Sequence, residues 1–225
     1  MNEPNRIYFI GNPYPRGHAL EDFLWSGRID EDESMWFDFH LQTDSYYDGE
    51  FNEEDALLST WKSKGMWCAY GECTLSSTRW GDYGIKINKT SGKAFFNDFI
   101  KDNLLADTLP RGVDFDYDKI AFGIYLIGHD RSANHKIKIK ETSKNKFDIE
   151  WSGKIALTYT GESGFNYDFF THLQNTEFDG FHYPKTWSIE KASDFFKDHF
   201  EDFEEYEFVE LNSKNDNKEY KFKKK

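Results

Sequence analysis

The strongest indication of the fold comes from residues 119–160, which read KIAFGIYLIGHDRSANHKIKIKETSKNKFDIEWSGKIALTYT. Residues 119–127 form a nearly continuous apolar run, which is typical of a strand buried on both faces. Residues 135–140, 147–152 and 155–160 instead alternate apolar and polar side chains, as strands with one core face do. Breaks at 143–145 and at Ser152-Gly153 predict hairpins between them. We therefore expect an antiparallel meander over residues 119–160.

Cross-strand charge supports this meander. Lysines occupy the polar positions of residues 135–140, and Asp148 and Glu150 occupy those of the next predicted strand. Opposite charges that face each other across two antiparallel strands stabilise the pair. Residues 35–42 alternate in the same way, and residues 67–75 and 83–88 are predicted to be further strands.

Three stretches have helical spacing. Residues 53–64 follow a possible N-cap at Asn52, and residues 91–105 follow one at Ser91. The strongest is 188–204, which begins at the possible cap Ser188 and carries a phenylalanine stripe that includes His199 as a core residue. The predicted fold class is therefore α+β, a single domain over residues 1–212 with a largely antiparallel sheet packed against about three helices. The basic residues 213–225 are predicted to be a disordered tail.

Composition restricts the partners. The chain has 225 residues and a formal net charge of −13, and 19% of its residues are aromatic. Such a charge repels nucleic acid and anionic membranes, and it favours a basic protein partner. No apolar run is long enough for a membrane span, and the N-terminus lacks the pattern of a signal peptide, so a cytoplasmic location is expected. Oligomeric state is left open.

The acidic charge is concentrated where a binding surface is expected. Residues 21–55 hold 13 acids and one arginine, a sum of −12. Aromatic side chains are interleaved with these acids, which is the composition of a protein-binding hot spot. A solvated face with no partner would explain the same charges. The predicted partner-binding residues are Trp25, Asp30, Glu31, Asp32, Glu33, Trp36, Tyr46 and Tyr47.

In overall composition the chain is similar to the small acidic immunity proteins that protect bacteria from toxins delivered by neighbours. This similarity implies occlusion of a basic toxin domain, and no site residue can be transferred from it. The alternative function is a carbohydrate-binding protein or a glycoside hydrolase that uses aromatic stacking and paired carboxylates. Its platform would be the aromatic-rich residues 165–187, for which core packing is the competing interpretation. A structural module without a ligand is the third hypothesis.

No motif identifies a catalytic, cofactor or metal site. Asp114, Asp116 and Asp118 match half of a calcium loop, but Lys119 and Tyr125 stand where the required Gly and Glu would be. Cys68 and Cys73 lack the spacing of a zinc site. No nucleophile elbow, metalloprotease motif or phosphate loop is present. We therefore predict no cofactor, no metal and no catalytic residue.

Overall fold

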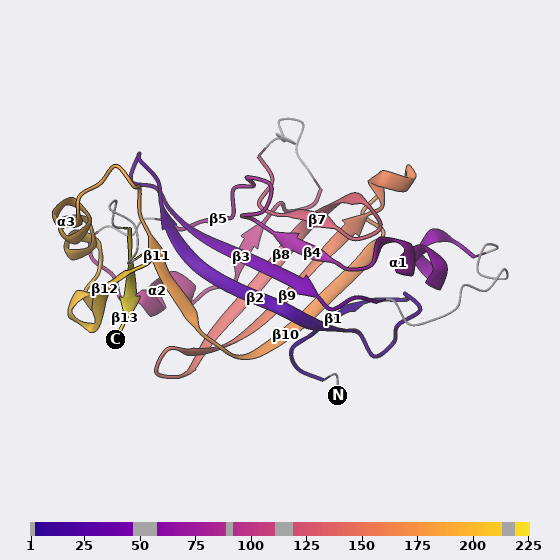
Figure 1. The fold of residues 1–225 in the computed structure, drawn as a ribbon, viewed down its shortest axis with the longest axis horizontal. Coiled ribbons are helices and arrows are strands. Elements are labelled where there is room, and N and C mark those ends of the chain that lie inside the picture. The colour runs from indigo at the N-terminus through magenta and orange to yellow at the C-terminus, as the bar shows by residue number, and fades with distance from the viewer. Residues whose placement is uncertain (1–2, 47–57, 89–91, 111–118, 213–218) are drawn as a thin grey trace.

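The computed structural model describes residues 3–46, 58–88, 92–110, 119–212 and 219–225. Eight strands form a ring in which every neighbour is antiparallel, and the pairing of β2 with β3 closes it (Figure 1). In sequence order they are β1 (Arg6–Phe9), β2 (His18–Ile29), β3 (Met35–Thr43), β4 (Thr74–Ser76), β7 (Gly123–Tyr125), β8 (His129–Ser143), β9 (Lys146–Ala156) and β10 (Tyr167–Thr176). The architecture is a closed antiparallel β-barrel.

Five further strands extend this barrel. They are β5 (Ile85–Lys86), β6 (Leu104–Ala106), β11 (Phe178–His182), β12 (Tyr206–Glu210) and β13 (Tyr220–Lys224). β11 pairs with β2 in parallel and leads to β13 and β12, while β5 pairs with β3 and β6 pairs with β8. The described helices are short: α1 (Lys64–Tyr70), α2 (Phe96–Ile100) and α3 (Ile189–His199). In Figure 1, α3, β12 and β13 lie at one end of the barrel and α1 lies at the opposite end.

The predicted α+β class is therefore wrong, because the chain is mostly β. Within the described part of the predicted helix 91–105, only Phe96–Ile100 is α-helical, and Leu104–Ala106 pair with β8 instead. The described end of the predicted helix 53–64 holds one 3₁₀ turn, Thr60–Lys62. α3 lies within the predicted 188–204 and has Ser188 as its cap, but it ends at His199. Pairing with distant strands overrides a local helical spacing, since it satisfies the same backbone groups.

The central meander is confirmed only in part. The strand predicted over 155–160 is wrong, because β9 ends at Ala156 and Thr158–Thr160 form a 3₁₀ turn. β8 and β9 form a hairpin through Lys144 and Asn145, and Lys138 lies opposite Glu150 with 3.9 Å between ammonium and carboxylate. The hairpin predicted at Ser152-Gly153 is wrong, because β9 continues through both residues. The strand predicted over 67–75 is also wrong, since α1 reaches Tyr70 and β4 starts at Thr74.

Large side chains fill the interior of the barrel. The inward residues of β2, β3 and β9 include Trp25, Phe37, Phe39 and Trp151, and each is at most 1% exposed. An eight-stranded barrel encloses just enough space for its own side chains. The interior is therefore a hydrophobic core, and a functional site must lie on the outside or at the ends of the barrel.

A second layer covers one end. The apolar face of α3 packs on β13, where the rings of Phe196 and Phe222 stack with 4.0 Å between centroids. The predicted disordered tail differs here from the structure, because Tyr220–Lys224 form β13. Residues 213–218 lie outside the described residues. Among the residues described, no helix combines the length and the apolar character needed to cross a membrane.

The attachment of β13 should depend on pH. Asp179 of β11 accepts hydrogen bonds from His182 (3.3 Å) and from Lys221 of β13, and these contacts lower its pKa to about 2. A folded-state pKa below the unfolded value contributes stability above about pH 4 that is lost as the pH falls toward 2. We expect Asp179→Asn to cost about 1–2 kcal/mol at pH 7 and about a third of that at pH 2.5. Urea unfolding at both pH values measures this, and an equal cost at both would contradict it.

Candidate functional site

The structure buries two of the predicted aromatic anchors and leaves one near the surface. Trp25 and Tyr46 are 0% and 3% exposed, and the Tyr46 hydroxyl donates a hydrogen bond to the Leu126 carbonyl. Trp36 is half-buried, and Arg28 and Lys86 lie over its ring at 5.5 and 5.3 Å. Tyr47 lies outside the described residues. Trp25 and Tyr46 therefore serve the core, and Trp36 is the predicted anchor that the structure places at the surface.

The predicted acidic residues 30–33 form the turn between β2 and β3. Asp32 accepts hydrogen bonds from the backbone and the hydroxyl of Ser34 (3.0 and 3.1 Å). Asp30 pairs with Arg28, which also binds the buried Asp38 at 2.8 Å. Carboxylates that bind nearby donors in this way order a turn. Asp30 and Asp32 thus have structural partners within the chain.

Glu31 connects this turn to the segment before α3. Its carboxylate accepts hydrogen bonds from the Thr186 hydroxyl and from Nε1 of Trp187 (3.2 Å). Glu33 is exposed, has a positive φ of 62°, and belongs to a shallow hollow of about 460 Å³ beside α3. Of the four predicted acids, Glu33 has the side chain most available to a partner.

An acidic face lies at the other end of β2. A register shift between Leu20 and Asp22 marks a β-bulge, and Glu21 and Asp22 are both exposed. At a bulge, two consecutive side chains can lie on the same face of the sheet, whereas in a regular strand they point to opposite faces. Glu72 joins them through a 3.0 Å hydrogen bond from the amide of Gln42 on β3. We call Glu21, Asp22 and Glu72, together with the exposed Asp44, the acidic face.

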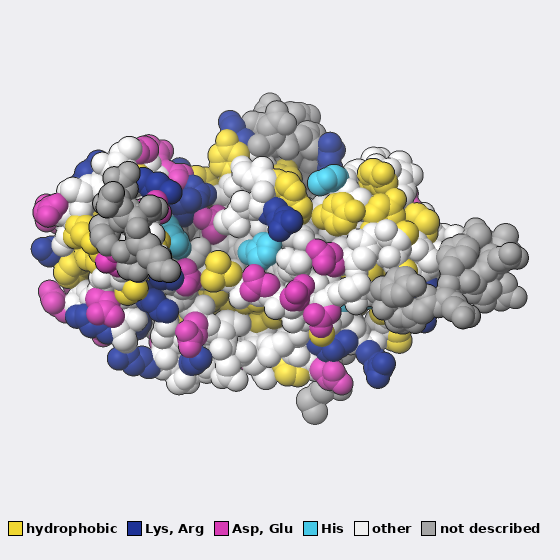
Figure 2. Space-filling model, in the orientation of Figure 1, with side chains coloured by type: hydrophobic (Ala, Val, Ile, Leu, Met, Phe, Trp, Pro, Cys, Tyr) yellow, Lys and Arg dark blue, Asp and Glu magenta, His cyan; other side chains and the backbone are white. Residues whose placement is uncertain are grey.

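His40 lies among these carboxylates. Its ring is 3.9 Å from the Asp22 carboxylate and hydrogen-bonds to the Ser76 hydroxyl at 3.0 Å. Burial lowers the pKa of His40, the charge of Asp22 opposes this shift, and the exposed Arg79 adds to it. Figure 2 shows carboxylate side chains gathered over the middle of the molecule, where β2 and β3 run, next to a histidine.

A band of aromatic rings adjoins the acidic face. Five rings follow one another with centroid distances of 6.0, 5.3, 6.4 and 5.8 Å. In spatial order this aromatic band is Trp80, His129, Tyr125, Tyr70 and Tyr159. Tyr159 is 60% exposed and Trp80 is 40% exposed. Figure 2 shows hydrophobic side chains gathered over β7 and the nearby 3₁₀ turn Thr158–Thr160.

Glycines hold the two ends of the band in place. A Cβ at Gly128 would lie 2.3 Å from the Tyr159 ring, and one at Gly123 would lie 2.7 Å from the Trp80 ring. Each ring therefore packs directly on backbone. Asp130 accepts hydrogen bonds from the backbone N–H of Tyr159 (3.1 Å) and of Ile127 (3.0 Å), and burial raises the pKa of its carboxyl. Rigid aromatic anchors lose little conformational entropy on binding.

No family model matches this chain, and no curated protein or solved structure matches it. The assignment of a site therefore depends on geometry alone. The sequence predicts a binding surface within residues 21–55 by one criterion, which is aromatic side chains surrounded by acids. The rings that meet it come from four separated segments, and Gly123 and Gly128 were the local signal that large side chains approach the backbone there.

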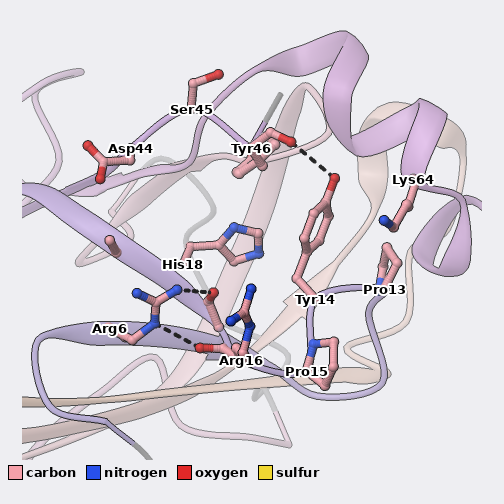
Figure 3. Close-up of a pocket in the computed structure, with 12 residues that line it drawn as sticks. Arg6, Pro13, Tyr14, Pro15, Arg16, His18, Asp44, Ser45, Tyr46 and Lys64 are labelled. Carbon is pink, nitrogen blue, oxygen red and sulfur yellow. Dashed lines mark hydrogen bonds between the residues drawn. The ribbon is translucent and has the colours of Figure 1, made fainter. Parts of the chain in front are cut away.

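A cationic pocket lies near α1 (Figure 3). It has a volume of about 420 Å³, and its charged lining residues are Arg6, Arg16, Lys64 and Asp44. Tyr14 and Tyr46 contribute walls, and His18 lies between them with ring centroids 4.8 and 4.9 Å away. The pocket therefore combines positive charge with aromatic surface.

The sequence predicts no metal site at Cys68 and Cys73 or at Asp114, Asp116 and Asp118. Cys68 lies in α1, and Cys73 precedes β4, where burial raises the pKa of its thiol. Within the described residues, no group of three or more His, Cys, Asp or Glu is placed to hold a metal ion. Asp114, Asp116 and Asp118 lie outside the described residues. Half of the eight aromatic residues of 165–187 are buried, namely Phe169, Phe178, Phe181 and Trp187.

Proposed function

We propose that this chain is a protein-binding module that recognises a basic partner through the aromatic band and the acidic face. The observation that carries the proposal is the band itself, five neighbouring rings with Tyr159 60% exposed and fixed against Gly128. Exposed Tyr and Trp are the side chains most often responsible for binding energy at protein interfaces.

Charge supports the choice of partner. The backbone N–H of Glu72 donates a hydrogen bond to the Tyr70 carbonyl at 3.0 Å, so the acidic face comes close to the band at this point. A basic partner would be attracted by the net charge of −13 and guided to this side by Glu21, Asp22 and Asp44. In its narrower form the proposal is a cytoplasmic immunity protein that covers a basic toxin domain by steric and electrostatic occlusion.

Alanine variants of the band test this function. Proteins captured from the source cells on the immobilised chain would be identified and purified, and their affinity measured by calorimetry. We expect a basic protein whose Kd rises at least tenfold, about 1.4 kcal/mol, with Tyr159→Ala or Trp80→Ala. The matched control is Phe95→Ala, because Phe95 is 57% exposed and lies beside α2 at the other end of the barrel.

Two results would reject the proposal. One is a partner whose affinity is unchanged by both band variants although they fold normally by circular dichroism. The other is a partner whose Kd does not rise with ionic strength, because screening should weaken the contribution of the acidic face. Neutralising Asp30, Glu31 and Asp32 is a poorer test, since these residues order a turn.

A second candidate function, carbohydrate binding or glycoside hydrolysis, has one observation in its favour. Asp82 and Asp107 accept hydrogen bonds from the backbone N–H of Gly123 and Ala121, so two carboxylates lie near the exposed Trp80. Burial raises the pKa of Asp82, and the charge of Asp107 raises it further. A raised carboxyl pKa suits a general acid. Retention of an oligosaccharide in place of a basic protein by the immobilised chain would favour this alternative.

A further inference from the structure

The cationic pocket is positively charged, whereas the chain as a whole has a net negative charge. The protein has six arginines, and two of them, Arg6 and Arg16, line this one pocket together with Lys64. Asp44 is the carboxylate among the lining residues, so the charged side chains there sum to +2. Positive charge gathered in a hollow attracts small anions despite a negative overall charge.

The loop that carries Arg16 is rigidly built. Gly17 donates a backbone hydrogen bond to Tyr14 (2.9 Å), which closes a turn with Pro15 and Arg16 at its centre. Gly17 has a φ of +66°, and a Cβ there would lie 2.7 Å from the Ile7 carbonyl. Proline at the second position and glycine at the fourth are typical of such a turn. The loop therefore has its shape before any ligand arrives.

Arg6 stabilises this loop through hydrogen bonds to its backbone. Its Nε donates to the Arg16 carbonyl at 2.8 Å and its Nη2 donates to the Gly17 carbonyl at 2.7 Å, as the dashed lines in Figure 3 show. Asn12 adds a hydrogen bond from its side-chain amide to Nε2 of His18 at 3.1 Å. We regard Arg6 as a positioning residue that also adds charge, because two of its donors are already used.

Arg16 is the cation placed to bind a ligand, and Lys64 adds positive charge nearby. Arg16 is exposed, and its guanidinium makes no ion pair or hydrogen bond to another described residue. Figure 3 shows the Arg16 side chain pointing toward the space between His18 and Tyr14. Lys64 is exposed as well, and its Nζ lies 5.8 Å from the centroid of the Tyr14 ring. The two cations therefore lie on opposite sides of Tyr14.

We propose that this pocket binds a phosphate monoester that carries a planar ring, of the mononucleotide class. Arg16 would bind the phosphate through its forked donors, and Lys64 would add a second charge. The planar ring would lie against Tyr14, which lines the pocket. A volume of about 420 Å³ is within the range of small-molecule sites. Asp44 belongs both to this pocket and to the acidic face, but no residue of the aromatic band lines the pocket, and the proposal does not depend on the proposed function.

Calorimetry and intrinsic tryptophan fluorescence, to which Trp67 contributes, test the proposal with AMP, inorganic phosphate, adenosine and citrate as probes. The fluorescence should respond because the rings of His18 and Trp67 stack with 5.7 Å between centroids. We expect AMP to bind one to one and inorganic phosphate to compete with it more weakly. Arg16→Gln should weaken AMP binding at least tenfold, and Lys64→Gln should weaken it severalfold. The matched control is Arg79→Gln, an exposed arginine that does not line the pocket, which should bind AMP like the parent protein.

Each other outcome would overturn a stated part of the proposal. Absence of AMP and phosphate binding at millimolar concentration, or equal AMP binding by the parent and Arg16→Gln, rejects the site. Citrate binding tighter than AMP rejects the phosphate. Phosphate binding as tight as AMP rejects the role of the ring, and adenosine binding as tight as AMP rejects the role of the cations.

Discussion

Replacement of Trp25 by alanine is expected to lower the free energy of unfolding by about 3–5 kcal/mol, the largest effect in the barrel. The Trp25 side chain is fully buried, and its ring lies 4.7–6.1 Å from the rings of five phenylalanines. They are Phe37, Phe39, Phe96, Phe147 and Phe178. Removal of the indole leaves a cavity that these rings cannot all fill. Chemical denaturation measures the loss.

Trp25→Phe is the matched control. Nε1 of Trp25 is buried without a hydrogen-bond partner among the described residues. An unsatisfied buried donor costs about 1–3 kcal/mol, so its removal offsets much of the volume that phenylalanine loses. We expect Trp25→Phe to stay within about 1.5 kcal/mol of the parent. An equal, small effect of both substitutions would show that Trp25 is not a core residue and would reopen its predicted role in partner binding.

Gly153→Ala is expected to cost about 1–3 kcal/mol, because β9 passes close to two rings at this position. A Cβ there would lie 2.6 Å from the Phe169 ring and 3.1 Å from Nδ1 of His135. Gly153 does not have a positive φ, so alanine meets no backbone strain. On conformational entropy alone, the substitution would stabilise the chain by about 0.4–1 kcal/mol. The sign of the measured change therefore reports the steric contact.

A second background shows where the cost arises. Phe169→Leu shortens the side chain that Gly153 accommodates, so Gly153→Ala should cost at least about 1 kcal/mol less in that background. Had Gly153 been the hairpin residue predicted from sequence, the two substitutions would have been additive. Additive free energies of unfolding would therefore contradict the observed course of β9.

Several local elements could be predicted because neighbouring residues are sufficient to specify them. β3 follows from strict alternation between Met35 and Gln42, and α3 follows from the Ser188 cap and the phenylalanine stripe. The turn at Lys144-Asn145 follows from a polar break between two alternating runs, and Asn145 has the positive φ of 53° that such a turn needs. Each signal acts within about ten residues.

The candidate site could not be predicted in the same way. Trp25 and Trp36 have acidic neighbours in sequence, but Trp25 points into the barrel and Trp36 lies at its surface. Tyr125 lies in a run that is predicted from the sequence to be buried on both faces, yet its ring is part of the aromatic band. Which aromatic side chains face solvent depends on which strands cover them, and that information is distributed over the whole chain.

The amino-acid order is sufficient for the acidic charge, the aromatic content, the alternating strands and the α3 helix, since each depends on composition or on short-range periodicity. Tertiary structure alone decides that β3 pairs with β4 and β1 with β10 to close a barrel, that Gly153 is a ring contact, and that the band and the pocket exist. The physical reason is that these features join residues up to about 160 positions apart. Their stability comes from burial and hydrogen bonds between distant segments, and no local pattern encodes such pairings.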